Sequence, residues 1–361
     1  MSIAWDLADF RKEVQDRIDS EMDRQRRVLS ELGEDMASLV DPVERLLAGG
    51  KRLRAAFCHS GYVAGGGTHL PQILSVATAM ELFQAAALLH DDVMDDSATR
   101  RGQATAHRAL ADEHHRQGWT GSADRFGISG AILAGDLCLV WTDEMVAGSG
   151  LPADQLARAR MTFDMMRTQL MGGQFLDVLV SARGWDHLDT AARIDQARQV
   201  VRFKSAKYSI EHPLLIGANA AGVDAHDADQ LSTYGLALGE AFQLRDDVLG
   251  VFGDPATTGK PAGDDLREGK RTVLLALALD GLDETGRADL SAGLGCTDLT
   301  DSDIDRLRDL IRRSGAVPRH EELIDAQTAL AHQALSAARE LTDEGRHALT
   351  ELIDLATARD S

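Results

Sequence analysis

Apolar residues recur at helical spacing along most of the chain, and the alternation typical of strands is hard to find. Residues three and four apart share one face of an α-helix, so this spacing predicts a protein built from helices. The stretch from Leu74 to Met94 is so apolar that we expect a helix buried nearly all round until its acidic residues begin. The predicted helices are two within 5–47, broken near Gly33, then 53–64, 74–94, 129–147, 153–182, 189–204 continuing to about 221, 227–252, 271–280 and three short charged helices to the C-terminus.

Polar, glycine-containing segments separate these helices. Residues 97–127 are predicted to form a long loop with a helical piece inside it, 253–269 an ordered loop, and 281–301 a connection. No stretch has the composition of a linker, and no internal repeat is seen. We therefore predict an all-α fold, a single large helical bundle, in which residues 1–361 form one domain.

The chain is acidic, with 58 Asp and Glu against 38 Lys and Arg and a formal net charge of −20. Nucleic-acid phosphates are held by clustered basic residues, so this charge argues against a nucleic-acid partner. It also argues against docking on an anionic membrane surface. Any anionic substrate would have to be held by a few local cations and by bound metal.

The cysteines and the apolar segments bear on the cellular compartment. Cys58, Cys138 and Cys296 are widely spaced and form no CxxC pair, which argues against a disulfide framework or zinc site and fits a reducing cytosol. The N-terminal segment lacks a basic stretch followed by an apolar run, so no signal peptide is expected. No stretch reaches the roughly 20 apolar residues of a spanning helix. We predict a cytoplasmic protein without a membrane span.

The first acidic cluster, HDDVMDD, ends the apolar helix at residues 90–96. Asp91 and Asp95 are four apart and should project together, whereas Asp92 should point about 100° away. Two carboxylates on one face repel each other unless cations lie between them, and hard oxygen ligands suit Mg²⁺. The alternative interpretation is a solvated helix end or an N-cap for the next turn.

A second acidic pair, Asp246-Asp247, also ends an apolar helical pattern and continues as DDV. Taken alone, it could be a charged helix end. Paired acids at buried helix ends rarely lack a partner, however, and here the same tripeptide occurs twice. We predict that the two helix ends face each other and form one site for several metal ions.

Basic residues that could hold an anion adjoin glycines or acids. Lys51 and Arg54, three apart, follow Gly49-Gly50 at the predicted start of a helix, where the helix N-terminus itself attracts phosphate. Arg100-Arg101-Gly102 comes just after the first cluster, close enough to fold back over it, and Arg favours bidentate contact with phosphate. Two lysines complete the set: Lys204 on a mostly apolar helix and Lys260 in the glycine loop. The alternative for each is a surface charge.

Five motifs, in this order, resemble the trans-polyprenyl diphosphate synthase family. They read GGKRLR, LLHDDVMDDSATRRG, KSA, FQLRDD and GDPATTGK, and they span roughly residues 45–275. The resemblance implies the isoprenoid synthase type of helical bundle, with a central active-site cavity, and a homodimer. It implies condensation of isopentenyl diphosphate with an allylic diphosphate, head to tail, by metal-assisted ionisation, to give an all-trans prenyl diphosphate.

The resemblance also implies roles for individual residues. About three Mg²⁺ ions per active site would be held by Asp91, Asp95 and Asp246, with Asp247 acting through water. The allylic diphosphate would be gripped by Arg100, Lys204 and Lys260. Isopentenyl diphosphate would be held by Lys51, Arg54, Gln84 and Arg101. The allylic chain near its reacting carbon would be lined by Gln174, Asp177 and Gln243. The catalytic set would be Asp91, Asp95, Arg100, Lys204, Gln243, Asp246 and Lys260.

Two positions depart from the family pattern. Gly250 replaces the third aspartate of the second motif, which removes the helical-face partner of Asp246, so we expect the metal there to rely on Asp246 and solvent. Ser205 stands where a threonine commonly follows the lysine, and it keeps the hydroxyl for substrate binding.

Product length should depend on residues upstream of Asp91, along which the growing chain is expected to lie. Ala86 and Ala87 stand where short-chain members tend to carry an aromatic blocker, so the pocket should extend past them. Phe83 and Met80, further down the helix, are candidate floors. We predict geranylgeranyl diphosphate as product, with farnesyl or a 25-carbon product as alternatives. Alanines that simply pack against a neighbouring helix are an equally fair interpretation.

Two other classes of protein share this kind of helical fold. A class I terpene cyclase pairs DDxxD with an Asn/Ser/Glu metal triad, but the only asparagine, Asn219, is not followed by the rest of that triad. A non-catalytic regulatory subunit usually loses the acids or the RRG, which are intact here apart from Gly250. Both are therefore weaker alternatives.

Overall fold

The computed structural model describes residues 6–185, 187–253, 263–296 and 298–357. Within these ranges the chain divides into two units, each with its own internal packing. Unit 1 comprises residues 1–159, 216–222 and 342–345, and unit 2 comprises residues 160–215, 223–341 and 346–361. That residues 1–361 act as one domain stays a prediction.

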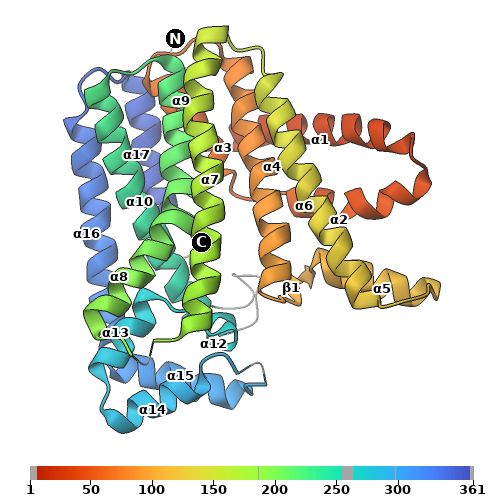
Figure 1. Cartoon of the computed structure of the whole chain (residues 1–361). Coiled ribbons are helices and arrows are strands. Elements are labelled where there is room, and N and C mark those ends of the chain that lie inside the picture. The colour runs from red at the N-terminus through yellow and green to blue at the C-terminus, as the bar shows by residue number, and fades with distance from the viewer. Residues whose placement is uncertain (1–5, 186, 254–262, 297, 358–361) are drawn as a thin grey trace. The chain divides into compact units, whose positions relative to one another are not determined.

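Helices make up most of the described chain (Figure 1). They are α1 (Leu7–Ser30), η1 (Glu34–Met36), α2 (Ala37–Leu47), α3 (Leu53–Ala64), α4 (Leu70–Met94), α5 (Ala106–Gln117), α6 (Ala123–Ala147), α7 (Ala153–Arg183), α8 (Thr190–Val200), η2 (Val201–Glu211), α9 (His212–Ala221), α10 (Ala225–Phe252), α12 (Asp264–Glu268), α13 (Val273–Gly281), α14 (Glu284–Gly293), α15 (Asp301–Arg313), α16 (Ala316–Ala337) and α17 (Asp343–Thr357). The described residues form one sheet, a hairpin of β1 (Thr99–Arg100) and β2 (Gln103–Ala104). The all-α prediction is confirmed.

Some predicted boundaries are wrong, because polar capping residues start helices that apolar spacing misses. Helix α6 begins at Ala123 rather than 129, where the Ser122 hydroxyl accepts a hydrogen bond from the backbone N–H of Arg125 at 3.3 Å. The predicted connection at 281–301 contains α14, where Asp283 accepts from the N–H of Gly286 at 2.8 Å. Helix α16, predicted to be short, has 22 residues.

The segment at 97–127 holds more structure than the loop with a helical piece that the sequence predicts. Its helical piece is α5. Before it, Thr99 pairs with Ala104 and Arg100 with Gln103 across a tight turn. Both turn residues have left-handed backbones, φ 51° at Arg101 and 74° at Gly102, as a two-residue hairpin turn of this hand requires. The turn therefore brings the RRG residues back toward the end of α4.

Helix α4 packs against α3 and α6 in unit 1 (Figure 1). Every residue from Ile73 to Phe83 is buried, which confirms the prediction of a helix buried nearly all round. The C-terminal end of α4 carries the first acidic cluster. A rigid, fully packed helix thus fixes the position of the acids.

Helix α10 of unit 2 packs against η2 and α16. Arg245 of α10 donates two hydrogen bonds to the Glu321 carboxylate of α16, at 2.6 and 2.8 Å, and this bidentate pair fixes the two helices against each other. The core beside them is built from α13, whose residues Val273 to Leu279 are all buried, and from Ile304 and Leu307 of α15. Helix α10 carries the second acidic cluster and is therefore as firmly held as α4.

Helices α4 and α6 are each long and apolar enough, by length and composition alone, to cross a membrane. Their most apolar windows are 78% and 39% buried, respectively, inside the structure. Core helices of soluble proteins meet the same criterion, and α4 has the burial of such a helix. The absence of a membrane span stays a prediction.

A buried ion pair ties α4 to the segment before α3. Arg52 and Glu81 lie 3.4 Å apart, with side chains only 4% and 3% exposed. The other oxygen of Glu81 accepts from the backbone N–H of Ala55 at 3.1 Å. Because both charges are removed from water, loss of one partner leaves the other uncompensated.

We expect Glu81→Ala to lower the free energy of unfolding by about 3 kcal/mol, because it leaves the Arg52 guanidinium buried without its carboxylate. Urea denaturation followed by circular dichroism would measure the change. Glu144→Ala is the matched control, since Glu144 pairs with Arg24 at the surface with 47% of its side chain exposed. A control that loses as much stability as Glu81→Ala would contradict the assignment of a buried, structural pair.

Candidate active site

The first acidic cluster lies at the C-terminal end of α4. Asp91 and Asp95 are partly exposed, and Asp95 caps the helix. Asp92 points elsewhere and is buried, with 2% exposure. The predicted division of the cluster, two acids on one face and one on another, therefore agrees with the exposure of these side chains.

Arg100 on β1 reaches back to this cluster, as the sequence predicts. Its guanidinium donates from Nε to Asp92 Oδ1 at 2.7 Å and lies 2.6 Å from the same oxygen through a second nitrogen. It also lies 3.8 Å from Asp91. Burial raises the pKa of Asp92 above its usual value, and the hydrogen bond from Arg100 opposes that rise. Arg100 thus joins two carboxylates that would otherwise repel each other.

Arg101 extends the positive charge into a pocket of about 260 Å³ in unit 1. Its Nη1 donates to the carbonyl oxygen of Leu46 at 3.0 Å. Burial lowers the pKa of Arg101, and the nearby Arg52 and Arg100 lower it further. Arg100 and Asp92 also line the pocket. An anion bound there would offset the crowding of positive charge.

The GGKRLR segment lies beside the same arginine. A Cβ atom at Gly50 would lie 3.6 Å from a guanidinium nitrogen of Arg101, so the two predicted basic motifs are neighbours. Helix α3 begins only at Leu53. Lys51 therefore precedes the helix, whereas Arg54 lies in its first turn. Arg52, which the sequence does not single out, is the buried anchor of this segment.

The predicted chain-length residues differ in exposure along α4. Gln84, Ala87 and Asp91 are partly exposed, at a spacing that places them on one face of the helix. Met80, Phe83 and Ala86 are buried, at 1%, 1% and 0% exposure. Of the two alanines, Ala87 is thus the one on the open face, and for Ala86 the packing interpretation fits better. Roles in product length stay predictions.

The second acidic cluster lies near the C-terminal end of α10 in unit 2. Asp246 is exposed, whereas Asp247 is buried with 4% exposure. Gln243, one turn earlier, donates to Asp247 Oδ1 at 3.0 Å and to Asp246 at 3.5 Å. Among the residues that the structure describes, Asp247 Oδ2 is buried and has no hydrogen-bond partner. Burial raises the pKa of Asp247 well above its usual value, and the neighbouring acids raise it further.

Lys204 lies on a π-helix, η2, which interrupts the continuous helix predicted from 189 to 221. Its ammonium group is 2.6 Å from Asp177 of α7, and both side chains are 20% exposed. Glycines on the neighbouring helices allow close packing of the backbones. A Cβ at Gly173 would lie 2.6 Å from the backbone nitrogen of Lys204, and a Cβ at Gly239 would lie 2.6 Å from the Cα of Ala206. The π-helix η2 thus packs closely between α7 and α10, and this packing sets the position of Lys204.

The other predicted residues are placed less fully. Gln174 and Ser205 are half-buried in unit 2, near Asp177 and Lys204 in the chain. Lys260 lies outside the described residues. That the two acidic clusters face each other across a central cavity stays a prediction.

The donor sets fit magnesium. Among the residues that the structure describes, no three His, Cys, Asp or Glu side chains converge tightly enough to hold a metal by themselves. Each cluster instead offers one or two carboxylates, and no donor in the described part of the chain reaches the buried Oδ2 of Asp247. Magnesium keeps several waters and is commonly bound by one or two carboxylates together with substrate phosphates. The clusters therefore suit a metal that arrives with its substrate.

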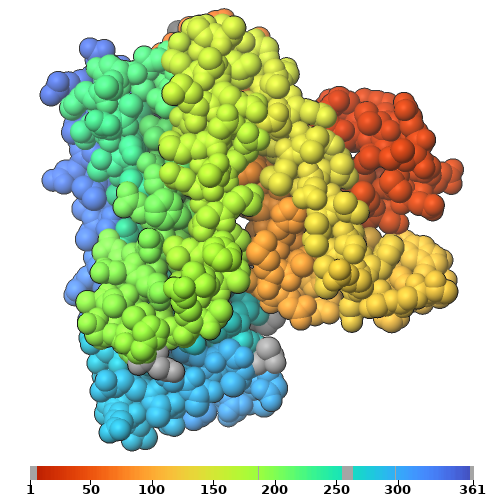
Figure 2. Space-filling view, in the orientation of Figure 1, coloured from red at the N-terminus to blue at the C-terminus, as the bar shows by residue number. Residues whose placement is uncertain are grey.

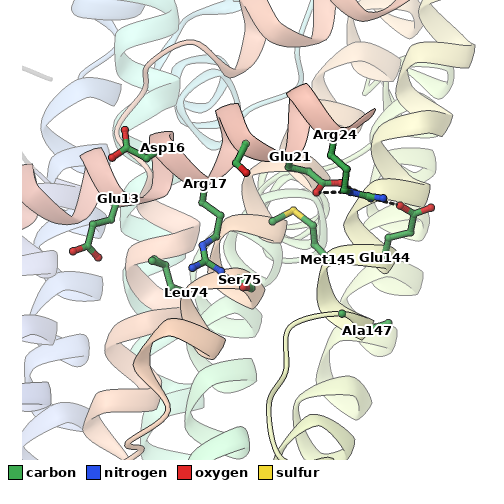
Figure 3. A pocket seen from close by; sticks show the side chains of 12 residues that line it. Glu13, Asp16, Arg17, Glu21, Arg24, Leu74, Ser75, Glu144, Met145 and Ala147 are labelled. Carbon is green, nitrogen blue, oxygen red and sulfur yellow. Dashed lines mark hydrogen bonds and ion pairs between the residues drawn. The ribbon is translucent and has the colours of Figure 1, made fainter. Parts of the chain in front are cut away.

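A pocket of about 1060 Å³ lies elsewhere in unit 1, between α1 and parts of α4 and α6 (Figure 3). It is lined by Leu74 and Ser75 at the opposite end of α4 from the acids, and by none of the predicted site residues. Arg24 lies 2.7 Å from Glu21 and also pairs with Glu144 (Figure 3). The pair of Arg24 and Glu144 joins α1 to α6, which fits a structural role.

Comparisons with known proteins agree with this geometry. A family model described as polyprenyl synthetase matches residues 36–311. The crystal structure of geranylgeranyl pyrophosphate synthase from Corynebacterium glutamicum, complexed with isoprenyl diphosphate and magnesium, is 40% identical, with a TM-score of 0.92 and coverage of 98% of this chain and 100% of that one. Geranylfarnesyl diphosphate synthase from Aeropyrum pernix is 32% identical over 316 residues, 86% of this chain and 91% of its own. Geranylgeranyl diphosphate synthase from Mycobacterium tuberculosis is 31% identical over 267 residues, 74% of this chain and 69% of its own.

Proposed function

This chain belongs to the polyprenyl synthetase family, and we propose that it condenses isopentenyl diphosphate with an allylic diphosphate, head to tail, to give all-trans geranylgeranyl diphosphate. It is a trans-prenyltransferase with the isoprenoid synthase fold that its sequence predicts. One observation carries the proposal: Arg100 joins Asp91 and Asp92 at the end of α4, beside a second arginine that lines a pocket. Carboxylates for a divalent cation and arginines for phosphate oxygens are what a diphosphate site needs.

Magnesium is proposed to bind at Asp91, Asp95 and Asp246, with Asp247 acting through water and about three ions per active site. When bound, it would draw negative charge off the diphosphate as the allylic carbon–oxygen bond breaks. The crystal structure of the Corynebacterium relative contains magnesium together with isoprenyl diphosphate, which supports this assignment.

Arg100 and Lys204 are proposed to hold the allylic diphosphate. Arg100 is positioned by Asp92, and Lys204 by Asp177. A cation that is fixed before the substrate binds needs little rearrangement when negative charge develops on the leaving group. Lys260 would share this role by resemblance.

The motifs before α3 and after α4 are proposed to hold isopentenyl diphosphate. Arg101 lines the pocket beside the first cluster, and Gly50 packs against its guanidinium. Lys51 and Arg54 flank the same segment and would add positive charge for the second diphosphate. The partly exposed Gln84 lies on the same face of α4 as Asp91.

The proposal of a geranylgeranyl product is based on the partly exposed face of α4. Between Gln84 and Asp91 this face carries the small residue Ala87, which leaves space for a chain longer than a short-chain blocker would allow. The Corynebacterium and Mycobacterium relatives are named for the geranylgeranyl product, and the Aeropyrum relative for the longer geranylfarnesyl product. A 25-carbon product is therefore the nearest alternative.

Purified protein incubated with isopentenyl and dimethylallyl diphosphates and Mg²⁺ should give a linear prenyl diphosphate, and Asp91→Asn should lower its rate of formation about 100-fold or more. The isosteric amide keeps the fold but removes a carboxylate needed for metal and for Arg100. Product formation would be followed by mass spectrometry.

The matched control for this experiment is Asp96→Asn, because Asp96 adjoins the cluster but pairs with Arg108 at the surface. Near-normal activity of Asp91→Asn would show that the metal site is wrongly assigned. A cyclised hydrocarbon from the wild-type protein would instead indicate a terpene cyclase, and no product would indicate a regulatory subunit.

Ala87→Phe should shorten the product, because an aromatic ring on the open face of α4 would block the growing chain one turn from Asp91. Chain length would be read by mass spectrometry of the dephosphorylated product. Leu88→Phe provides the control, since Leu88 is also partly exposed but points about 100° away from Ala87. An unchanged product in Ala87→Phe would mean that the chain does not pass along this face.

A homodimer is also proposed, and α6 supports it. Phe126, Leu133 and Val140 recur every seven residues on α6 and are 39%, 55% and 53% exposed. In the space-filling view the yellow surface of α6 lies uncovered (Figure 2). An apolar stripe at this spacing is suited to packing against a second copy.

Light scattering of the wild-type protein should therefore give about twice the chain mass of 39.0 kDa. Replacing both Leu133 and Val140 by Asp should shift it to the mass of a monomer, because buried charges would disrupt the stripe. Leu330→Asp, at an exposed apolar position of α16, should leave the mass unchanged. A wild-type protein with the mass of one chain would disprove the dimer.

A further inference from the structure

The turn at residues 49–52, between α2 and α3, has an unusual backbone. Gly49 and Gly50 have φ values of 78° and 118°, and Arg52 has a φ of 53°. Glycine adopts such left-handed values without steric penalty, but at Arg52 the Cβ atom makes them unfavourable. A conformation of this kind persists only where the surrounding contacts hold it. The residues that supply these contacts therefore also fix Lys51, which lies between Gly50 and Arg52.

Two residues on one face of α1 hold the 49–52 turn. The Nε of Arg11 donates a hydrogen bond to the carbonyl oxygen of Lys51 at 3.0 Å. One helical turn later, Gln15 Oε1 accepts from the backbone N–H of Gly49 at 3.3 Å and from the guanidinium of Arg52. Both side chains of α1 are half-buried. Helix α1 is thus bonded to the turn at its first, third and fourth residues.

The orientation of the Gln15 amide is fixed by a further contact. Its nitrogen donates to Asp19 Oδ1 at 2.7 Å, so its oxygen faces Gly49 and Arg52. Arg52 in turn pairs with the buried Glu81 of α4. One guanidinium therefore joins α1, the turn and α4, and all of these segments belong to unit 1.

The 49–52 turn adjoins the pocket of about 260 Å³ that Arg101 lines. Ala48, directly before the turn, lines the same pocket. A Cβ atom at Gly50 would lie 3.6 Å from a guanidinium nitrogen of Arg101. A displacement of the turn would therefore move Lys51 and the backbone beside Arg101 together.

We propose that Arg11 and Gln15 are positioning residues for isopentenyl diphosphate. They act through the 49–52 turn, which they hold so that Lys51 and the backbone of Gly50 stay in place beside Arg101. Helix α1 thereby takes part in binding one of the two substrates, although it lies outside the predicted motifs. The inference rests on the proposed function, because that function assigns the GGKRLR segment to isopentenyl diphosphate.

Initial rates measured with each substrate varied in turn test the inference. Gln15→Leu should raise the KM for isopentenyl diphosphate about 10-fold, the effect of losing a hydrogen bond to a charged group. The KM for dimethylallyl diphosphate should stay near its wild-type value, because Arg100, which is proposed to bind it, is held by Asp92. Lost binding that the ground state and the transition state share raises KM and leaves kcat unchanged, so kcat should also stay near its wild-type value.

Two matched variants separate positioning from a general loss of stability. Gln15→Glu keeps an acceptor oxygen for both donors and should keep most of the affinity for isopentenyl diphosphate. Gln25→Leu removes another glutamine of α1, which is 3% exposed and donates to Glu144 of α6 at 2.9 Å. It should lower the melting temperature, because α1 loses a buried contact, and leave both KM values unchanged.

A wild-type KM for isopentenyl diphosphate in Gln15→Leu would overturn the inference. So would a rise that Gln25→Leu reproduces, or one that extends equally to the allylic substrate, because either result would indicate that α1 only stabilises the fold. A loss of affinity in Gln15→Glu as large as that in Gln15→Leu would also contradict the role of the acceptor oxygen.

A double-mutant cycle gives a second test. Lys51→Ala removes the ammonium group that the turn is proposed to position. In the presence of this substitution, Gln15→Leu should raise the KM for isopentenyl diphosphate by less than it does alone, because residues that act through a shared partner are not additive. Fully additive effects would show that Gln15 does not act through the turn.

These outcomes differ from a failure of the proposed function. A wild-type protein that forms no prenyl diphosphate from the two substrates and Mg²⁺ would refute the proposed function. A wild-type protein that forms it, together with a Gln15→Leu variant whose KM values are normal, would refute only the role of α1.

Discussion

Carboxylates gathered at the ends of tightly packed helices repel one another, and the arrangement of the site follows from the need to offset that repulsion. At the end of α4 the Arg100 guanidinium joins Asp91 and Asp92. On α10 Asp247 accepts a hydrogen bond from Gln243, a neutral amide. Arg100 therefore supplies positive charge within the first cluster, whereas the hydrogen bond from Gln243 to Asp247 in the second cluster brings no charge.

Arg52, Arg100 and Lys204 are each paired with an acid, and the exposure of their side chains distinguishes a structural pair from cations that can bind a ligand. Arg52 and Glu81 are almost fully buried, so their pair fastens the GGKRLR segment to α4 and cannot reach a ligand. Arg100 and Lys204 are 17% and 20% exposed, so a phosphate can reach them while carboxylates hold their charged groups in place. In unit 1 the buried pair thus holds the GGKRLR segment rigidly against α4, the helix whose acids position Arg100, and such fixed cations are what electrostatic preorganisation requires.

Local features of the sequence predict much of this arrangement. Helical spacing identifies most of the helices, and the position of Arg100 shortly after Asp91 predicts that it folds back over the acids. What the sequence does not predict depends on contacts between distant segments. The π-helix around Lys204 needs two glycines from other helices, and the pairing of Arg52 needs Glu81. Composition and spacing contain no direct signal for such contacts.

The π-helix has a consequence for how this gene can vary. Its hydrogen bonds span five residues rather than four, so η2 holds more chain per turn than the α-helices on either side. Deleting one codon within it would let the segment relax to ordinary helical pitch and rotate the preceding residues by about 100° relative to α9. Lys204 would then turn away from Asp177, although its own codon is untouched. Segment length, more than the identity of individual side chains, should therefore be under constraint here, and alignments of homologues should run through it without gaps.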